Sequence, residues 1–429
     1  MTLSVRLQRR GVFQTVGSIE VVAENNGRFT YSDEWCSRPS NPPLSLSLPL
    51  KRRSSHSALM RPYFEGLLPE ADARKAIADK LGISEHSYLH ILQALGDECI
   101  GAVTVTDASG AEHAPEPRYQ AMGPKELRAL SDRSFAETAI LAERSRLSLS
   151  GGQAKAGLYQ GLDGSWYLPT GTAPSTHIVK PSSARFPDIV INEAICMMAA
   201  EKCGIPAAKV EVFDTGRSPL LSIARFDRTG GLGSISAGFA SGLPMPLRLH
   251  QEDLCQALGV LSSSKYESRE SRYLSKAAKL IRGHSVRPVR DIKHFWDSIA
   301  FNYLIGNCDN HIKNYSLVYD EEMEHLRLAP CYDLVCTTMY PELSRDMGIH
   351  IGSKLDIDSI EPADFGELAD VLTLGREEAF SRLDAVRARL VDALEQATDS
   401  LAAQGHKDAR RVGKAILGSA KDRLGKPRA

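Results

Sequence analysis

Residues 306–314 read GNCDNHIKN, and residues 330–334 read PCYDL. An apolar run that ends at Ile305 leads into the first of these stretches, which predicts a loop that leaves the end of a buried helix. Between the two stretches, residues 315–319 and 326–328 alternate like the strands of a hairpin, which would bring the second stretch back beside the first. Because loops held by rigid elements commonly carry the chemistry of a protein, we expect the functional site here.

The side chains of these two stretches suit phosphoryl transfer from ATP, in which a protein mainly positions the nucleophile and neutralises charge on the phosphates. Asp309 is the carboxylate placed to take the proton of an acceptor hydroxyl. Mg²⁺ prefers oxygen ligands and keeps several waters, so Asn314 and Asp333 would suffice to hold it. The interval from Asp309 to Asn314 matches that between Asp and Asn in the catalytic loop of protein kinases, and Asp333 then takes the role of the later metal-binding Asp.

The sequence departs from the protein-kinase motifs at two places, and the same stretch also has an alternative interpretation. No His-Arg pair precedes Asp309, and Leu334-Val335 follows Asp333 where kinases have Phe-Gly. The alternative is an Asn- and Asp-rich turn before a hairpin, since these side chains favour turns by bonding to their own backbone.

A second informative stretch reads RLSLSGGQAKAGLY over residues 146–159. Alternation on both sides of two glycines predicts a strand, a turn and a return strand, and the turn's amides could cradle phosphate oxygens; an ordinary hairpin turn is the alternative. The strand predicted at 176–180 ends in Lys180, which matches the phosphate-binding lysine of kinases, although exposed strand-end lysines are common. In the helix predicted from Ile191, Glu193 would either pair with Lys180 or simply suit the helix dipole.

Composition and length place the chain in the ordinary globular class. Its 52 Lys and Arg balance 53 Asp and Glu, so no net charge would draw it to nucleic acid or to a membrane. No apolar run approaches the roughly 18 residues that cross a bilayer, and the N-terminus lacks the layout of a signal peptide. The eight cysteines are scattered without a Cys-x-x-Cys motif, which favours buried free thiols in a reducing cytoplasm. We interpret Cys308 and Cys331, which flank the expected site, as packing residues.

The remaining segments predict scaffold elements. Short strands are expected in the first 50 residues, among them the alternating run 44–50, and helices follow up to Leu95. This part contains no catalytic set and is interpreted as a scaffold or a partner-binding module. A strand expected over 220–228 would end where backbone groups could hold an adenine edge, and the chain is expected to be mostly helical from Gln251 onward.

The order of glycine turn, strand lysine, helix glutamate, Asp-x-x-x-x-Asn loop and later Asp is that of a kinase. In addition, seven stretches resemble the HipA family, the serine/threonine-kinase toxins of bacterial type II toxin-antitoxin modules. These stretches are PLSLSLPL at 43–50, FEGLLP at 64–69, GDECIGAV at 96–103, QEDLCQ at 251–256, KYE at 265–267, the loop at 306–314, and GIHI at 348–351.

This resemblance implies an α+β fold, with a two-lobed protein-kinase-like architecture, an extra N-terminal α/β subdomain and a mostly helical C-lobe. The implied boundaries are 1–113 for the N-terminal subdomain, 114–226 for the N-lobe with its phosphate loop, and 227–429 for the C-lobe with the catalytic loop.

The resemblance also implies roles for individual residues. Asp309 would be the catalytic base, Asn314 and Asp333 the Mg²⁺ ligands, and Lys180 the phosphate anchor. ATP would be bound by a phosphate loop, an adenine hinge and two lining segments. These are, in turn, Ser150, Gly151, Gly152, Gln153, Ala154 and Lys155; Ala224, Arg225 and Phe226; His311, Ile312, Lys313 and Asn314; and Tyr332, Asp333, Leu334 and Val335.

In the family, a serine just before the glycines is autophosphorylated, and its position corresponds to Ser148, with Ser150 as the alternative. A phosphate group carries about −1.5 to −2 charge, so it cannot share a phosphate-binding turn with ATP. The modification would therefore silence the kinase.

The implied partners are a HipB-like helix-turn-helix antitoxin, operator DNA contacted mainly through that antitoxin, and a protein substrate. An aminoacyl-tRNA synthetase is the expected substrate, with glutamyl-tRNA synthetase first, and no membrane is involved. Basic residues near the C-terminus would face solvent or touch DNA phosphates: Arg410, Arg411, Lys414, Lys421, Arg423, Lys426 and Arg428. Two alternatives stay open, a small-molecule or lipid kinase and a non-catalytic co-repressor subunit.

Overall fold

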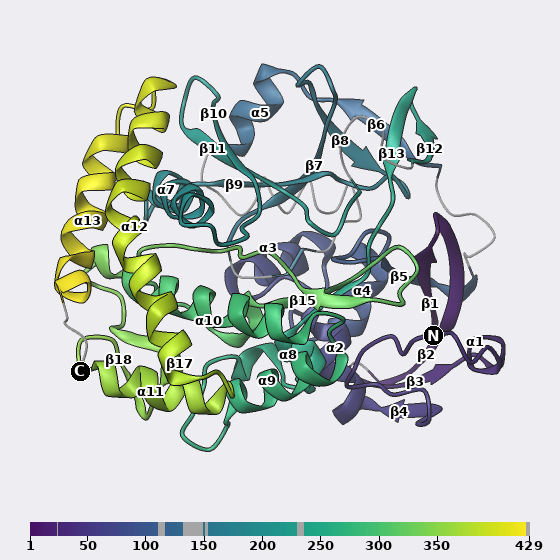
Figure 1. The fold of residues 1–429 in the computed structure, drawn as a ribbon. Coiled ribbons are helices and arrows are strands. Elements are labelled where there is room, and N and C mark those ends of the chain that lie inside the picture. Colours follow the sequence, from purple (N-terminus) through teal and green to yellow (C-terminus); the bar gives the residue numbers. More distant parts are fainter. Residues whose placement is uncertain (24, 110–115, 132–148, 151–152, 230–235, 426–429) are drawn as a thin grey trace. The chain divides into compact units, whose positions relative to one another are not determined.

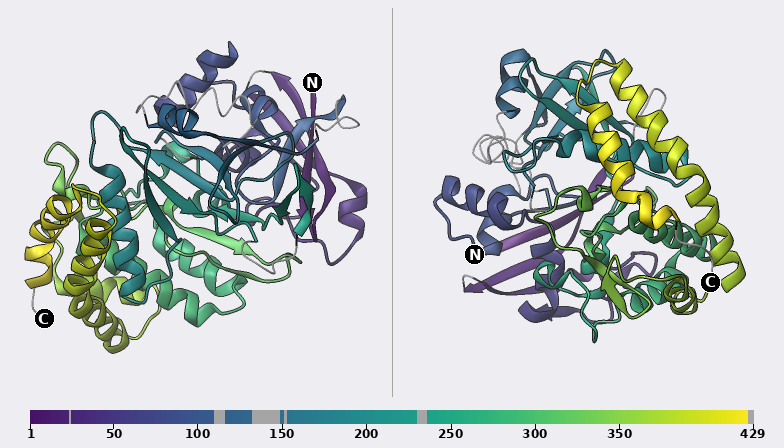
Figure 2. Two further views of the ribbon diagram at one scale, coloured as in Figure 1. Left: turned by 90° about the horizontal axis from the view of Figure 1, so that it is seen from above. Right: turned by 90° about the vertical axis from the view of Figure 1, so that its left-hand side faces the viewer.

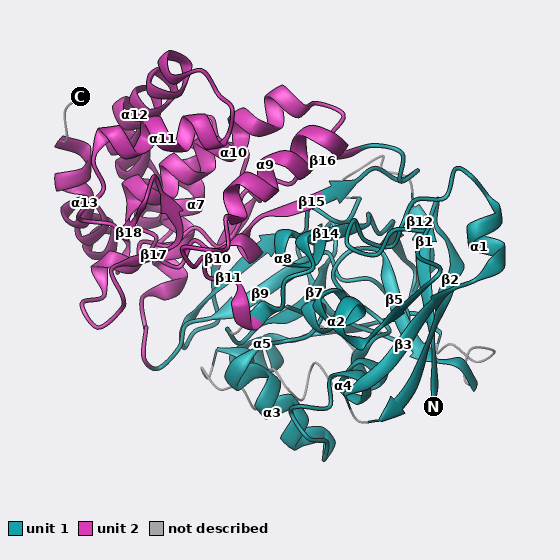
Figure 3. Cartoon of the chain, turned by 90° about the horizontal axis from the view of Figure 1, so that it is seen from below, with its two compact units in different colours: residues 1–184, 213–262, 318–325 teal, residues 185–212, 263–317, 326–429 magenta. Residues whose placement is uncertain are grey.

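The computed structural model describes residues 1–23, 25–109, 116–131, 149–150, 153–229 and 236–425 (Figure 1). The chain divides into two compact units (Figure 3). Unit 1 comprises residues 1–184, 213–262 and 318–325, and unit 2 comprises residues 185–212, 263–317 and 326–429. Both units combine helices with mainly antiparallel strands, as the predicted α+β class requires.

The first sheet of unit 1 is antiparallel throughout, and its strands lie in the order β4 (Ser54–His56), β3 (Asn26–Tyr31), β2 (Val12–Ala23), β1 (Thr2–Arg9) and β5 (Val103–Asp107). Leu3, Val5 and Leu7 of β1 are fully buried because alternate side chains of a strand point to one face. The helices of this region are α1 (Asp33–Ser37), α2 (Ser57–Gly66), α3 (Ala71–Leu81) and α4 (Tyr88–Leu95). Of these, α2 packs on β3 and α4 on β5.

Residues 44–50 form turns, so the strand expected there is wrong. Pro43 just before the segment and Pro49 within it lack the backbone N–H that a strand ladder would need. Leu44 and Leu48 are fully buried, whereas Leu46 and Leu50 are partly exposed, and the backbone bonds to a side chain instead of a strand. The Ser45 hydroxyl and the Leu46 N–H donate to the carboxylate of Glu252, at 2.5 and 3.1 Å. Glu252 is fully buried, and this burial raises its pKa to about 7.

The second sheet lies mainly in unit 1, with its strands in the order β10 (Val210–Asp214), β11 (Pro219–Ala224), β9 (His177–Pro181), β7 (Ala156–Gln160), β8 (Trp166–Thr170) and β6 (Arg118–Ala121). Leu158, Val179 and Leu220 form its core together with Leu130 of α5 (Pro124–Leu130). The strand predicted at 176–180 is confirmed as β9.

Two further elements of unit 1 are the hairpin of β12 (Ser236–Ala240) and β13 (Leu243–Pro246), and β14 (Gln251–Asp253), which leads into α8 (Leu254–Leu258). The helix therefore begins three residues later than expected. Asp253 explains the difference because it caps the helix. Its carboxylate accepts from the Gln256 N–H, while the Gln256 side chain accepts from the Asp253 N–H.

Unit 2 is mainly helical, and its residues after 262 fall in the part of the chain that is predicted to be mostly helical. Its helices are α7 (Ile189–Lys202), α9 (Tyr273–His284), α10 (Pro288–Ile305), α11 (Pro362–Val371), α12 (Arg376–Ala403) and α13 (Ala409–Gly425). The long α12 lies beside α7 and α13 (Figure 2). The short strands of unit 2 are β15 (Ser316–Tyr319), which ends in unit 1, β16 (Leu326–Leu328), β17 (Asp346–Ile351) and β18 (Lys354–Asp356). The strands β15 and β16 are neighbours in one sheet, which confirms the predicted hairpin.

The basic C-terminal segment is not a uniformly exposed face. Arg423 of α13 is only 3% exposed, and its guanidinium donates to the Leu304 carbonyl at 3.3 Å and to the Thr338 hydroxyl at 3.4 Å. The expectation that Arg423 faces solvent or DNA is therefore wrong, because its charge stabilises the last turn of α10. Lys426 and Arg428 lie outside the described residues.

All eight cysteines are free thiols, and all except Cys36 are buried. Burial raises the pKa of Cys308 to about 11 and that of Cys331 to about 12, which confirms them as unreactive packing residues. No helix within the described ranges has the length and apolar composition needed to cross a membrane.

Candidate active site

The candidate catalytic loop begins where α10 ends. Gly306 adopts φ +80°, and a Cβ atom there would collide with the Thr338 hydroxyl, so the position requires glycine. The Gly306 carbonyl accepts from the N–H groups of Thr337 and Thr338, at 3.0 and 3.1 Å. The Thr337 hydroxyl accepts in turn from the Cys308 N–H at 2.7 Å. These bonds fix the start of the loop against the 3₁₀ turn η4 (Thr337–Met339).

Asn307 joins the two stretches that the sequence singled out. Its side-chain oxygen accepts from the Asp309 N–H at 3.1 Å, and its amide donates to the Asp333 carbonyl at 3.2 Å. The same amide donates to the Asn302 side chain at 2.7 Å, and Asn307 is 1% exposed. One buried side chain therefore supports the main chain at both proposed carboxylate positions. The sequence did not lead us to predict a role for Asn307. Its position just after the helix-ending glycine places it in the loop, but its contact with Asp333, 26 residues later, cannot be read from the sequence.

Asp309 presents its carboxylate at the surface of unit 2. The side chain is 57% exposed. Its Oδ1 accepts a hydrogen bond from the Tyr266 hydroxyl at 2.6 Å. The Asn314 amide donates to the Asp309 carbonyl at 3.0 Å, which leaves the Asn314 side-chain oxygen as the end that can bind a cation. The structure thus brings the predicted base and one predicted metal ligand into direct contact.

Asp333 is held in an uncommon backbone conformation. Its φ of +54° lies in the left-handed region, which costs a non-glycine residue about 1 kcal/mol and persists only where the surroundings impose it. The preceding Cys331 is fixed by its N–H bond to the Pro206 carbonyl and by the Ala208 N–H, at 2.8 and 2.9 Å. The Tyr332 hydroxyl then donates to the Lys313 carbonyl at 2.9 Å. These contacts fix the two residues that precede Asp333.

His311 sits beside the candidate base, with 3.9 Å between its Nε2 and Asp309 Oδ1. Burial lowers the pKa of His311 to about 3, and the charge of Lys265 acts in the same direction. The ring is therefore neutral at physiological pH and supplies no positive charge for a phosphate. Ile312 and Leu334, expected to line the nucleotide, are 0% and 2% exposed, so their side chains belong to the core.

The predicted phosphate loop belongs to unit 1. Ser148, Gly151 and Gly152 lie outside the described residues, as does most of the strand expected before the glycines. After the glycines, the Gln153 side chain donates to the Pro181 carbonyl at 3.4 Å, which ties the loop to the residue that follows Lys180 on β9. The Lys155 ammonium donates to the Ser150 carbonyl at 2.8 Å, and Ala154 is buried. Lys180 itself is 3% exposed, which contradicts the alternative of an exposed strand-end lysine.

The predicted adenine hinge starts at the end of β11. The strand stops at Ala224, four residues before the expected end. The Arg225 N–H donates to the Thr176 carbonyl at 2.9 Å, so an adenine contact from residues 224–226 would use other main-chain atoms. The strand ends here because the following side chains turn into a buried ionic cluster.

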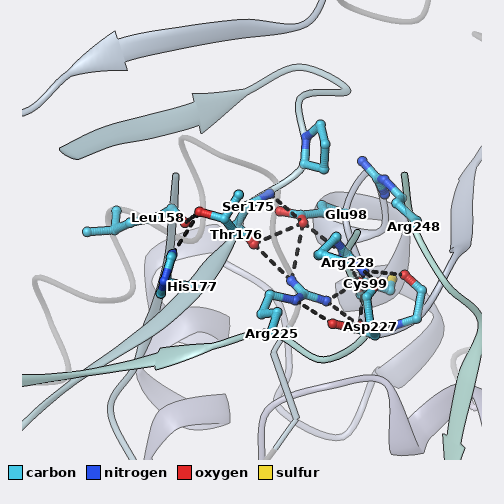
Figure 4. Close-up of polar contacts among 12 residues, drawn as sticks. Glu98, Cys99, Leu158, Ser175, Thr176, His177, Arg225, Asp227, Arg228 and Arg248 are labelled. Atoms are coloured by element: carbon cyan, nitrogen blue, oxygen red, sulfur yellow. Dashed lines mark hydrogen bonds and ion pairs between the residues drawn. The ribbon is translucent and has the colours of Figure 1, made fainter. Parts of the chain in front are cut away.

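The ionic cluster (Figure 4) consists of Glu98, Arg225, Asp227, Arg228 and Arg248. Arg225 donates to Asp227 at 2.7 and 2.9 Å and to Glu98 at 3.2 Å, and Arg228 donates to Glu98 at 3.0 Å. Burial raises the pKa of both carboxyl groups, but the charges of Arg225 and Arg228 outweigh it, and both pKa values end below their usual range. The motif at 96–103 therefore holds the end of β11 through charge, a role that sequence reasoning did not assign to Glu98.

Gly348 of β17 packs closely against the backbone of the catalytic loop. A Cβ atom at Gly348 would lie 2.6 Å from the Asn310 carbonyl oxygen and 2.7 Å from the His311 nitrogen. We expect Gly348→Ala to lower the free energy of unfolding by about 1–3 kcal/mol, because backbone on both sides must move. Chemical denaturation would measure the change. The matched control is Gly418→Ala in α13, where a Cβ meets nothing within 4 Å. Equal stability of the two variants would contradict the close packing.

The structure connects some of the predicted site residues within each unit. In unit 2, contacts connect Asp309 with His311 and Asn314, Asn307 links this loop to Asp333, and Tyr332 bonds to Lys313. In unit 1, Gln153 contacts β9, and Lys155 contacts Ser150. Among the described residues, no three His, Cys, Asp or Glu side chains form a metal site. A nucleotide-bound Mg²⁺ does not need one, since it takes one or two protein ligands together with phosphate oxygens.

An α+β fold with an Asp-x-x-x-x-Asn loop tied to a later Asp is consistent with a kinase-like fold. Two family models make this more specific. The HipA N-terminal domain matches residues 5–106, and the HipA-like C-terminal domain matches residues 147–397. The chain belongs to the HipA family, which confirms the resemblance seen in its sequence.

Relatives of known name agree with this assignment. A protein of Sinorhizobium fredii named "Putative kinase Y4mE" is 33% identical over 87% of this chain and 86% of its own length. The serine/threonine-protein kinase toxin HipA of Shewanella oneidensis is 28% identical over 85% of this chain and 82% of its own. A solved structure of Shewanella oneidensis HipA with HipB and operator DNA matches with a TM-score of 0.78 and 24% identity, covering 99% of this chain and 98% of that one. This match confirms the predicted fold class.

Proposed function

We propose that this chain is an ATP-dependent serine/threonine protein kinase and acts as the toxin of a type II toxin-antitoxin module. The bonds of Asn307 to the Asp309 N–H and the Asp333 carbonyl carry the proposal, because they give the base and the metal ligand one buried support. Such shared support is what phosphoryl transfer needs, since its catalysis is mostly positioning and charge neutralisation.

In the proposed reaction, Asp309 accepts the proton of a serine or threonine hydroxyl while the hydroxyl oxygen bonds to the γ-phosphorus of ATP. The bond from the γ-phosphorus to the bridging oxygen breaks, and ADP leaves with the electron pair. Mg²⁺, when bound with ATP, neutralises the charge that develops on the phosphates. Asn314 and Asp333 would hold that ion, and Lys180 with residues 150–155 would bind the phosphates.

The partners follow from the family. HipA of Shewanella oneidensis has been solved with HipB and operator DNA. By analogy, we infer a HipB-like helix-turn-helix antitoxin for this chain, with DNA contacted mainly through it. The protein substrate would be an aminoacyl-tRNA synthetase, glutamyl-tRNA synthetase first. Incubation of purified glutamyl-tRNA synthetase with the chain and radiolabelled ATP would test this; labelling of small hydroxyl compounds or lipids instead would favour a small-molecule kinase.

Autophosphorylation at Ser148 is expected to silence the enzyme. A phosphate there would place about −1.5 to −2 charge in the turn that binds the ATP phosphates. Intact-mass and peptide analysis after incubation with ATP and Mg²⁺ should find one phosphate on the peptide that contains Ser148, and Ser148→Ala should remove it. Phosphate on Ser150 with unmodified Ser148 would contradict the assignment.

A further inference from the structure

Tyr266 makes a contact with Asp309 that the proposed reaction does not explain. The phenol oxygen lies 2.6 Å from Asp309 Oδ1, and the phenol donates the proton. Tyr266 is 52% exposed, and its ring meets the His311 ring edge-on, with 5.1 Å between the ring centres. A hydroxyl that donates to the catalytic carboxylate is the arrangement an acceptor must adopt before transfer. The phenol thus stands where an acceptor hydroxyl is expected.

The backbone beside Tyr266 is firmly placed. The Glu267 N–H donates to the Gly348 carbonyl at 2.8 Å. The buried Glu267 carboxylate accepts from the N–H groups of Tyr273 and His350, at 2.5 and 2.8 Å. Gly348 lies against the loop backbone at Asn310 and His311. The main chain is therefore anchored to the catalytic loop. Rotation of the Tyr266 side chain would leave that anchor in place but would separate the ring from His311 and from the Lys265 ammonium, which lies 5.6 Å from the ring centre.

We propose that Tyr266 is a built-in acceptor mimic, which occupies the acceptor position at Asp309 in the resting enzyme and must swing away before a substrate hydroxyl can bind. The proposal rests on Asp309 being the catalytic base. The two motifs KYE and GIHI then share one role, which is to place this phenol. An acceptor must first break the hydrogen bond between Tyr266 and Asp309. Its binding is therefore weaker by the factor that corresponds to the net free energy of about one hydrogen bond.

Water is the smallest acceptor and needs the same position. Its oxygen bonds to the γ-phosphorus, the bond to the bridging oxygen breaks with ADP taking the electron pair, and the proton passes to Asp309. Hydrolysis of ATP by water therefore reports access to the base without any protein substrate.

The test compares initial rates of ADP release from ATP and Mg²⁺ for the full chain and three variants. Tyr266→Phe should raise the rate about three- to tenfold with an unchanged KM for ATP, because the ring stays and only the competing hydroxyl is lost. Tyr273→Phe is the matched control, since it loses a phenol bond of 2.7 Å to the Ser264 carbonyl in the same segment. It should hydrolyse ATP at the wild-type rate. Asp309→Asn sets the background.

The possible results distinguish a failure of the acceptor mimic from a failure of the proposed kinase activity. Wild-type hydrolysis and autophosphorylation no faster than in Asp309→Asn would overturn the kinase itself. An active wild type with an unchanged Tyr266→Phe rate would overturn the acceptor mimic alone. A lower rate in Tyr266→Phe would also overturn it, because the phenol would then be positioning Asp309. Phosphate found on Tyr266 after incubation would overturn it as well, since the phenol would be a true acceptor.

Discussion

Asp309→Asn is expected to lower phosphate transfer from ATP at least about a hundredfold, the lower end of what a positioned general base contributes. An amide keeps the shape of the carboxylate but cannot take the acceptor proton. The loop should keep its conformation, because Asn307 and Asn314 bind the N–H and the carbonyl of residue 309 rather than its side chain. The loss should therefore appear in the rate and not in the stability.

Radiolabel incorporated into the chain from ATP, followed over time, gives this rate. The matched control is Asp392→Asn, an exposed aspartate of α12, which should behave as wild type. Thermal unfolding of all three proteins would show that the variants are folded. Wild-type rates in a folded Asp309→Asn protein would contradict the assignment of the base.

Glu98→Ala should lower the free energy of unfolding by about 3–5 kcal/mol, the usual cost of removing one partner from a buried ion pair. The ionic cluster holds the side chains of Arg225, Arg228 and Arg248 against those of Glu98 and Asp227. Without Glu98, three buried positive charges face one carboxylate. Burial already lowers the pKa of Arg248 to about 10, which shows how strongly the site disfavours uncompensated positive charge.

Chemical denaturation monitored by fluorescence would measure the effect. Asp358→Ala is the matched control, because it removes an exposed partner of Arg345 at the surface of unit 2. Surface pairs contribute about 0–1 kcal/mol, so this variant should unfold close to wild type. Equal midpoints for the two variants would mean that the cluster adds no stability.

Local patterns in the sequence predicted the parts of the site that depend on neighbouring residues. The hairpin of β15 and β16, the strand that carries Lys180, and the loop after Gly306 follow from periodicity and from a helix-ending glycine. The predictions were wrong where contacts with residues distant in the sequence determine the local structure. Residues 44–50 alternate like a strand, yet their backbone bonds to Glu252. The strand predicted to 228 stops at Ala224 because Arg225 turns toward Glu98, far away in the sequence.

The candidate site shows the same division. Residue types and spacing predicted Asp309, Asn314 and Asp333 as site residues, because the pattern is local to two short stretches, and their roles stay predictions. They did not identify Asn307 or Tyr266, whose roles depend on contacts that spacing cannot reveal. The predicted domain boundaries at 113 and 226 stay a prediction, as does the meeting of Lys180 with the two carboxylates.

The central claim is that Lys180, Asn314 and Asp333 act on one bound nucleotide. A crystal structure with Mn²⁺ and a non-hydrolysable ATP analogue would test this claim most directly. The anomalous signal of Mn²⁺ should lie within bonding distance of Asn314 and Asp333, with Lys180 on the phosphates and the γ-phosphate nearest Asp309. A nucleotide bound elsewhere, or a metal held by neither Asn314 nor Asp333, would contradict it.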